Sequence, residues 1–297
     1  MQRIQFVLIM TMLRISALLP LSAARKLGRF MAALYWPFGG RSRKVTEINI
    51  AAAFPHLSPK QQSTLARNSI LATGELFTEM GHIWLKPWSR VAELVLEVKG
   101  AELIKQAQSQ GRGVILLGPH LGNWEMIGLH AATMGTTVSL FQPPKIEGLG
   151  PVIQSARQAS GATLVPTDSR GLAKLLRSVK QGGISGILPD QAPDDVNSGQ
   201  NSPFMGLPCF TGTLASNMIR RTGAVAVFGY ARRVPGGFEL NYEAVEDDVY
   251  SEDTSLSLAA MNRGVEHCLR NCVDQYQWEY KRFRVRPRDG KGLYDAM

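Results

Sequence analysis

The sequence of 297 residues contains few cysteines and few charged side chains for its length. The three cysteines are Cys209, Cys268 and Cys272, and no two of them form a Cys-x-x-Cys pair. A disulfide framework, a zinc ribbon and a thioredoxin-type motif are therefore excluded, and we expect a reduced protein that faces the cytosol. Charged residues make up 19% and hydrophobic residues 44%, which excludes the disordered, collagenous and coiled-coil classes.

Several common catalytic motifs are also missing. The sequence has no P-loop, no G-x-G-x-x-G after an expected strand, no G-x-S-x-G and no H-E-x-x-H. These motifs bind phosphates or dinucleotides, present a nucleophilic serine, or hold a catalytic zinc ion. We therefore expect no metal ion and no cofactor.

Acidic residues are absent from the first 44 residues, which carry eight bases. The last twenty residues add a net charge of +3, so the segment 45–277 has a net charge of −2 although the whole protein has +9. Nucleic-acid binding requires a basic surface on the body of the protein, and this distribution argues against one. The excess of terminal bases favours anionic lipid or an acidic protein as the partner.

Residues 4–24 are apolar enough to predict a membrane anchor. A helix of this length rises about 30 Å, which is the thickness of a hydrocarbon core. Arg14 near the centre makes insertion marginal, and the bases directly after residue 24 would place the rest of the chain in the cytoplasm. Three interpretations stay open: a membrane helix that is tilted or interfacial, a cleaved signal peptide, and an amphipathic helix packed on the body.

From residue 95 onwards, short apolar runs bounded by glycine alternate with amphipathic stretches. This alternation predicts an α/β fold with a mostly parallel sheet flanked by helices. Strands are expected at 113–117, 137–141, 162–165, 183–188, 224–230 and 237–246, and helices at 59–85, 101–109, 122–134, 147–159, 170–180, 211–222 and 255–275. Residues 190–210 are the only long irregular segment, which predicts a functional loop. We divide the chain into a membrane anchor with a basic interfacial segment at 1–44 and an α/β domain at 45–297.

The most informative segment is 118–125, directly after an expected strand. It places His120 in a glycine-rich loop and Glu125 in the first turn of the next helix. An ionised glutamate there can accept one imidazole N–H, fix the tautomer, and leave the other nitrogen as a base. No Ser, Cys or Thr lies between the two residues, so we expect His120 to deprotonate a substrate hydroxyl directly.

Five ordered motifs resemble those of a known enzyme family. The sequence HLGNWE at 120–125 resembles the H-x4-D/E motif of glycerolipid acyltransferases, in the form found in the late acyltransferases of lipid A biosynthesis. These are the lauroyl and myristoyl transferases of Gram-negative bacteria. The other motifs are N-[LI]-x3-F-P at 49–55, P-D-Q at 189–191, P-F-[FM]-G at 203–206, and W-x3-R-F-x-x-R-P at 278–287. The chain departs from the family after Gln191, and the different loop there is expected to shape the acceptor site.

The resemblance implies transfer of a fatty acyl chain to a hydroxyl of the Kdo-lipid A precursor in lipopolysaccharide biosynthesis. The donor would be an acyl carrier protein thioester, or acyl-CoA as co-substrate, and no acyl-enzyme would form. The resemblance also implies the cell inner membrane as location, membrane lipids as partners, and a catalytic domain on the cytoplasmic face. The alternative is the same chemistry on another membrane glycolipid or amino-lipid.

Two further residues are expected to assist the histidine. Arg157, on the helix after the next strand, is a candidate for stabilising the oxyanion or for holding Glu125. Asn123 either caps the helix that begins there or contacts the substrate.

Four polar residues are candidates for binding the acceptor. Asp190 and Gln191 follow another expected strand, where they position the acceptor or structure their own loop. Arg284 and Arg286 belong to a C-terminal basic cluster that runs to Arg288. This cluster either binds lipid phosphates, Kdo carboxylates or acyl carrier protein, or is a solvated tail.

Overall fold

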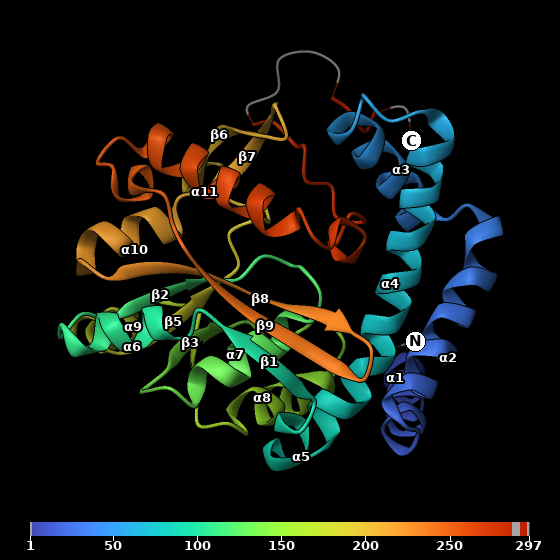
Figure 1. Ribbon diagram of the computed structural model, residues 1–297, viewed down its shortest axis with the longest axis horizontal. Coiled ribbons are helices and arrows are strands. Elements are labelled where there is room, and N and C mark those ends of the chain that lie inside the picture. The colour runs from blue at the N-terminus through green and yellow to red at the C-terminus, as the bar shows by residue number, and fades with distance from the viewer. Residues whose placement is uncertain (1, 287–291, 296) are drawn as a thin grey trace.

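A five-stranded mixed sheet forms the centre of the computed structural model, which describes residues 2–286, 292–295 and 297 (Figure 1). The strand order is β1 (Val95–Lys99), β9 (Gly237–Ala244), β8 (Val225–Val234), β2 (Val114–Leu117) and β5 (Ile184–Ile187). Strand β9 runs antiparallel to β8, and the other pairs are parallel. Beside this sheet lies a parallel pair, β3 (Val138–Phe141) and β4 (Thr163–Pro166). The predicted α/β fold is confirmed.

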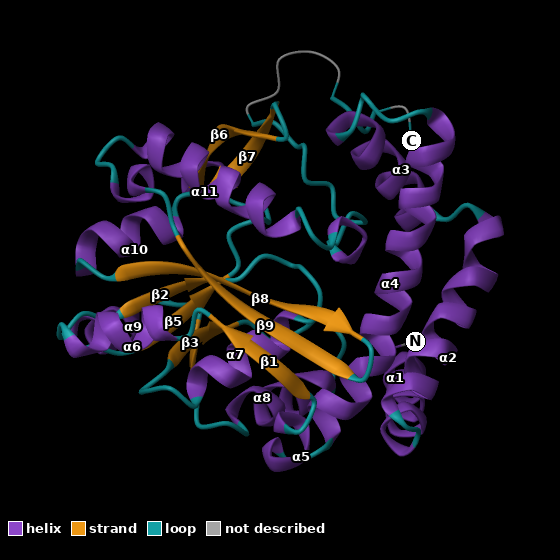
Figure 2. Cartoon of the chain, in the orientation of Figure 1, coloured by secondary structure: helices purple, strands orange, loops and turns teal. Residues whose placement is uncertain are grey.

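Helices cover both faces of the sheet (Figure 2). Successive side chains of β2 point to opposite faces of the sheet. Ile115 and Leu117 belong to the apolar cluster on one face, and Val114 and Leu116 belong to the cluster on the other. The first cluster includes side chains of α9 (Ser169–Lys180), α10 (Leu214–Thr222) and α11 (Thr254–Leu269). The second includes side chains of α6 (Glu102–Ser109) and α7 (Trp124–Ala132), and α8 (Leu149–Gln158) packs beside β4. Helix α11 ends at Leu269 and is therefore shorter than the helix predicted at 255–275.

The N-terminal residues form a helical hairpin. Its helices are α1 (Gln2–Leu18) and α2 (Leu21–Tyr35), and α3 (Arg41–Ala53) and α4 (Pro59–Leu85) follow. Pro20 separates α1 from α2 because proline has no N–H and cannot continue a helix, so the single helix expected over 4–24 is wrong. Within the described residues, no helix is both long enough and apolar enough to span a membrane. Both hairpin helices pack on α4, which agrees with the third interpretation of this segment.

Glycines allow the hairpin to lie very close to α4. A Cβ atom at Gly28 of α2 would lie 2.1 Å from the carbonyl oxygen of Gly74, and one at Gly74 would lie 2.3 Å from that of Gly28. The start of α4 is fixed by a capping box, in which Ser58 and Gln61 bond to each other's backbone N–H groups. The long helix α4 thereby joins the hairpin to the sheet (Figure 1).

The segment 190–210 is not irregular throughout, which corrects our expectation. It contains the strand β6 (Gly199–Phe204) and begins β7 (Leu207–Gly212), and the two form an antiparallel hairpin. Met205 and Gly206 form its turn with φ angles of 51° and 75°, and the Met205 N–H donates to the Glu266 carboxylate at 2.6 Å. Pro203 and the polar residues before it concealed this strand.

Candidate active site

Two side chains that follow neighbouring parallel strands meet at the carboxyl edge of the sheet. In the ladder of β2 and β5, Leu117 lies opposite Ile187, and three residues later each chain reaches His120 or Asp190. The Nδ1 atom of His120 is 2.8 Å from Oδ1 of Asp190, and the His120 backbone N–H donates to Oδ2 at 2.8 Å. Asp190 therefore orients both the imidazole ring and the loop that carries it.

The charge of Asp190 determines the tautomer of His120. Burial alone would raise the pKa of Asp190, which is 1% exposed, but the charge and hydrogen bonds of His120 and the charge of Arg282 outweigh burial. The pKa of Asp190 is therefore lowered. An ionised carboxylate only accepts hydrogen bonds, so Nδ1 of His120 carries the proton and Nε2 carries a free lone pair.

The second ring nitrogen of His120 lies beside the side-chain amide of Gln191. Gln191 Nε2 lies 3.2 Å from His120 Nε2 and also donates to Gln277 Oε1 at 3.3 Å. The Gln277 backbone N–H donates to the His120 carbonyl at 3.0 Å, and the Trp124 ring packs edge-on against the imidazole with centroids 4.9 Å apart. Gln277 was not predicted as a site residue, and its place beside Trp278 in the C-terminal motif was the only signal.

Glu125 does not orient His120, which corrects the predicted pairing. The two oxygens of Glu125 accept hydrogen bonds from Nη2 and Nε of Arg157, at 2.7 and 2.9 Å. Burial by itself would lower the pKa of Arg157, but the charge of Glu125 and its hydrogen bonds raise it above its usual value. Of the two roles suggested for Arg157, the contact shown is the one that holds Glu125. Glu125 lies in the first turn of α7, which begins at Trp124, and its carboxylate faces Arg157 on α8.

An apolar cavity lies directly beside this site. About 700 Å³ of empty space, part of it open to solvent, lies between the ends of β2 and β5, the β3–β4 pair, α7 and α8. Trp124, Glu125 and Arg157 line it together with apolar side chains such as Ile127 and Leu140. The cavity therefore has the ion pair of Glu125 and Arg157 in its wall and the His120 loop next to it.

Residues 1–285 match the sequence profile described as bacterial lipid A biosynthesis acyltransferase. The chain belongs to this family. It is 26% identical over 274 residues to the lipid A biosynthesis lauroyltransferase of Escherichia coli (strain K12), covering 91% of this chain and 88% of that protein. It is 25% identical over 272 residues to the lipid A biosynthesis palmitoleoyltransferase of the same strain, covering 90% and 87%. A lipid A biosynthesis acyltransferase of Haemophilus influenzae is 24% identical over 263 residues, covering 86% and 79%. The protein is thus an acyltransferase.

Asn123 has a different contact in this acyltransferase from those predicted. It occupies the position before α7, but its side chain forms no capping hydrogen bond. The side chain is fully buried, and its Nδ2 atom donates to Glu79 Oε2 at 3.0 Å. Glu79 lies within α4 and belongs to no motif, so it was not predicted. The signal available was an acidic residue on the buried face of a long helix.

The C-terminal segment brings the acyltransferase motifs together. Asn49 Nδ2 donates to the carbonyls of Trp278 and Tyr280, at 2.7 Å each, and the Tyr280 hydroxyl accepts from the Ala192 N–H. The Arg284 guanidinium lies over the Tyr280 ring, with its Cζ atom 5.9 Å from the ring centroid. Arg286 donates a hydrogen bond to the Asp194 carbonyl at 2.6 Å. Both arginines therefore lie beside the loop that follows Gln191. Pro287 and Arg288 of the same cluster fall outside the described residues.

The three cysteines of this acyltransferase lie inside the protein. Cys209, Cys268 and Cys272 are buried and unpaired. Burial raises the pKa of Cys268 well above its usual value and that of Cys272 to about 12, which makes both thiols poor nucleophiles. Among the described residues, no group of three or more His, Cys, Asp or Glu side chains is arranged to hold a metal ion.

Proposed function

We propose that the protein transfers a fatty acyl chain from an acyl carrier protein thioester to a hydroxyl of the Kdo-lipid A precursor in lipopolysaccharide biosynthesis. The observation that carries this proposal is the His120–Asp190 pair beside an apolar cavity, in a chain of the lipid A acyltransferase family. The names of the related lauroyl and palmitoleoyl transferases agree with a fatty acyl group as the group transferred.

The proposed reaction needs a base but no acyl-enzyme. The acceptor hydroxyl first displaces the Gln191 amide from Nε2 of His120. Nε2 then removes the hydroxyl proton while the hydroxyl oxygen attacks the thioester carbonyl. The C–S bond then breaks, and the proton passes from Nε2 to the departing thiolate. Asp190 holds Nδ1–H throughout and stabilises the transient imidazolium. General-base assistance of this kind contributes about 10² to 10⁴ in rate.

The cavity is the proposed binding site for the acyl chain. Gly128 of α7 and Gly186 of β5 line it, and neither position carries a side chain that would fill the space. Glu125 and Arg157 neutralise each other in the wall, so they can lie beside an apolar chain. The cavity begins beside the base, which would leave the thioester carbonyl near His120 when the chain enters.

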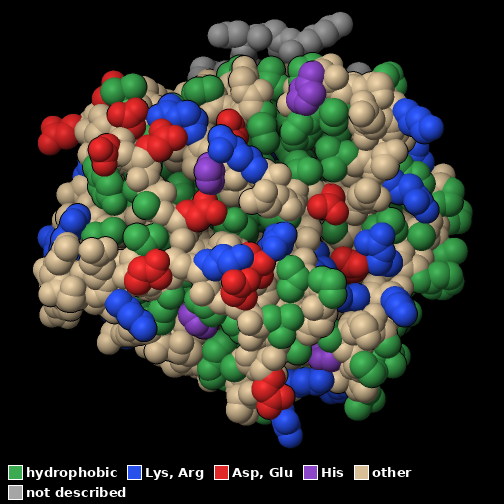
Figure 3. Space-filling view, in the orientation of Figure 1, with side chains coloured by type: hydrophobic (Ala, Val, Ile, Leu, Met, Phe, Trp, Pro, Cys, Tyr) green, Lys and Arg blue, Asp and Glu red, His purple; other side chains and the backbone are tan. Residues whose placement is uncertain are grey.

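The outer surface of the N-terminal hairpin is the proposed contact with the cytoplasmic leaflet of the inner membrane. Leu8 and Phe30 are 61% and 60% exposed, and Leu18 is 86% exposed. Hydrophobic and basic side chains lie next to one another along this edge of the molecule (Figure 3). Apolar side chains interleaved with bases are typical of helices that lie in the interface of an anionic membrane.

The decisive experiment incubates the purified protein with acyl-loaded carrier protein and the Kdo-bearing lipid A precursor, and detects the product by mass spectrometry. The wild type should add one ester-linked acyl chain without any metal ion, and His120→Ala should reduce the rate by at least about 100-fold. If a strain without the gene keeps all its lipid A chains but loses an acylated glycolipid or amino-lipid, the alternative acceptor is correct. Near-normal transfer by a folded His120→Ala protein would exclude the mechanism.

A further inference from the structure

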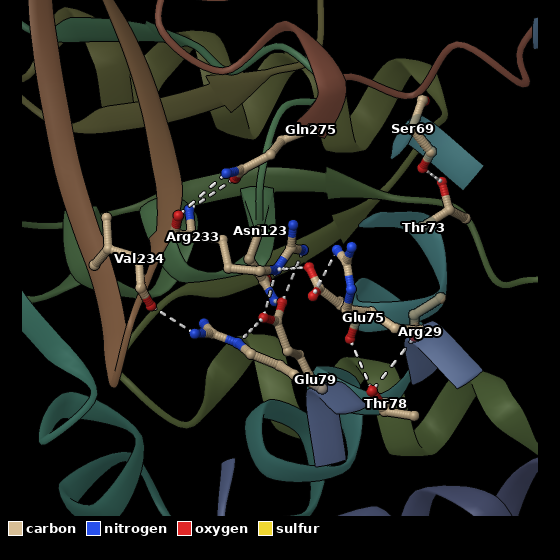
Figure 4. Close-up of polar contacts among 12 residues, drawn as sticks. Arg29, Ser69, Thr73, Glu75, Thr78, Glu79, Asn123, Arg233, Val234 and Gln275 are labelled. Carbon is tan, nitrogen blue, oxygen red and sulfur yellow. Dashed lines mark hydrogen bonds and ion pairs between the residues drawn. The ribbon is translucent and has the colours of Figure 1, made fainter. Parts of the chain in front are cut away.

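Glu79 lies fully buried where the hairpin, α4 and the end of β8 meet. Its Oε1 atom accepts from Nε of Arg25 and from Nε of Arg233, both at 2.6 Å. Its Oε2 atom accepts from Nη2 of Arg233 and from Nδ2 of Asn123, both at 3.0 Å. Arg233 and Asn123 are both directed at Glu79 (Figure 4). One carboxylate therefore joins the hairpin, the sheet and the residue that precedes α7.

The charge of Glu79 is held by these partners. Burial alone would raise the pKa of Glu79, but the charge and hydrogen bonds of Arg233, the charge of Arg25 and the hydrogen bond of Asn123 together lower it. A buried ion cluster is a costly way to hold helices together, because apolar side chains of similar size stabilise a core at least as well. An ion cluster instead fixes the relative positions of its side chains, because each hydrogen bond is directional and joins two particular atoms.

Arg25 links the hairpin to the sheet by hydrogen bonds. Besides Glu79, it donates to the carbonyl oxygens of Val234 and Gly237 at 2.6 and 2.9 Å, and it stacks on the Phe238 ring at 5.0 Å. These contacts hold the turn between β8 and β9. The close approach of Gly28 to α4 brings Arg25 within reach of Glu79.

The other end of the cluster holds the loop that carries His120. The Asn123 N–H donates to the Ala231 carbonyl at 2.9 Å, and the Gly122 N–H donates to the Gln275 carbonyl at 3.0 Å. Gly122 has a φ of 59°, and a Cβ atom there would lie 2.0 Å from the Ala231 carbonyl oxygen. The side chain of Gln275 bonds to both backbone groups of Arg233, at 2.8 and 3.1 Å. The loop and the cluster are therefore linked twice, through Asn123 and through Gln275.

We propose that Glu79 is a positioning residue for the catalytic loop, and that Arg25 makes the docked N-terminal hairpin part of the support of the active site. Loss of Arg25 removes one of the two cations that hold the Glu79 carboxylate, so that carboxylate positions Asn123 less firmly, and His120 lies three residues from Asn123. The effect on acyl transfer rests on the proposed function, whereas the effect on the order of the loop does not.

The experiment compares Arg25→Gln with Arg29→Gln. Arg29 lies on the same helix, but it pairs at 3.2 Å with Glu75 and its side chain is 47% exposed. For Arg25→Gln we expect kcat to fall about tenfold with KM within about twofold, because binding is intact while the base is misplaced. Amide hydrogen exchange in residues 119–126 should become faster. Arg29→Gln should match the wild type in both measurements.

A double-mutant cycle separates positioning from a general loss of stability. In an Asn123→Ala background the direct link to Glu79 is cut and only the link through Gln275 remains, so Arg25→Gln should lower kcat by less than about twofold further. Equal losses in both backgrounds, or wild-type exchange in Arg25→Gln, would overturn the inference. If Arg25→Gln does not fold, Arg25→Lys is used, since lysine reaches fewer of the three acceptors and should give a smaller effect of the same kind. If the wild type transfers no acyl chain, the proposed function fails, and the exchange measurements still decide this inference.

Discussion

Asp190 holds His120 twice, by the ring nitrogen Nδ1 and by the backbone N–H, at 2.8 Å each. The two residues follow adjacent parallel strands, whose ladder fixes their relative position. The position of the His120 imidazole is therefore set by the sheet and not by the short loop between His120 and Glu125. Both residues also lie at the carboxyl ends of strands, where ligands of open α/β sheets bind.

Replacing Asp190 by asparagine should impair the base without changing the shape of the site. The amide can donate to Nδ1 and so favour the tautomer with its proton on Nε2, which cannot accept the hydroxyl proton. We expect kcat to fall by about 10² to 10⁴ with little change in KM, measured at saturating donor and acceptor. Asp194→Asn, on the exposed loop nearby, serves as control and should keep wild-type kcat. A fall of less than about threefold in Asp190→Asn would remove Asp190 from the mechanism.

The lowered pKa of Asp190 predicts how its contribution to stability depends on pH. Because the folded pKa lies below the unfolded value of about 3.9, the contribution is fully present above about pH 5. It is lost as the pH falls through the folded pKa, by at most about 1.4 kcal/mol per pH unit. Urea unfolding of the wild type and Asp190→Asn at pH 6 and pH 3.5 measures this. The difference in unfolding free energy should be smaller at pH 3.5, and a constant difference would contradict the assignment.

Glu125 and Arg157 should behave as one unit. Either single alanine substitution leaves the partner's charge unpaired in the cavity wall, so we expect each to abolish most acyl transfer. In the double alanine variant no unpaired charge remains, and its loss should be at least about tenfold smaller than the product of the single losses. Rates measured for the four proteins give this directly. Losses that simply multiply would show that the two side chains act independently.

Gly128 should control the length of the acyl chain. A Cβ atom added at Gly128 would meet no atom within 4 Å, so larger side chains can enter the cavity without a clash at this point. For Gly128→Met we expect kcat/KM for the longest accepted chain to fall about tenfold relative to a chain two to four carbons shorter, since each buried methylene contributes about 0.8 kcal/mol. A series of acyl-loaded carrier proteins tests this, with Gly128→Ala as control. An unchanged chain preference in Gly128→Met would place the acyl chain elsewhere.

The hairpin surface should bind membranes through its exposed apolar side chains. A double substitution of Leu8 and Phe30 by glutamate should lower binding to anionic vesicles by at least about tenfold in a flotation assay. Leu256→Glu is the control, because Leu256 is 49% exposed but lies on α11, away from the hairpin. If the control and the double variant lose binding equally, the hairpin surface is not the contact.

The structure gives His120 a different carboxylate partner from the one that the sequence predicted. His120 and Asp190 were both predicted at strand ends, and parallel strands bring such ends together. Glu125 was preferred because it is near His120 in the sequence. Which strands are neighbours, and in what register, depends on the packing of the whole sheet, and no local pattern shows that β5 lies beside β2.

Two other errors have local causes. Helix α1 ends before Pro20, and the apolar stretch expected to form one helix becomes two helices that pack against α4. The hairpin β6–β7 was missed because β6 is largely polar and contains Pro203, and because its turn uses Met205 in a left-handed conformation, which is rare for a side chain of that kind. Helix α4 and most strands were predicted within a few residues, because their apolar patterns are strong.

The order of the strands has a consequence for how the protein is made. Strand β1 is the first strand to be synthesised, yet it pairs with β9, which begins at Gly237. The His120 loop likewise acquires its hydrogen bonds to Gln275 and Gln277 only when that late segment arrives. A chain halted on the ribosome before residue 275 therefore lacks these bonds, and of the contacts described for His120 it can form those to Asp190, Gln191 and Trp124. We therefore expect the full set of contacts around His120 to form only when synthesis is nearly complete.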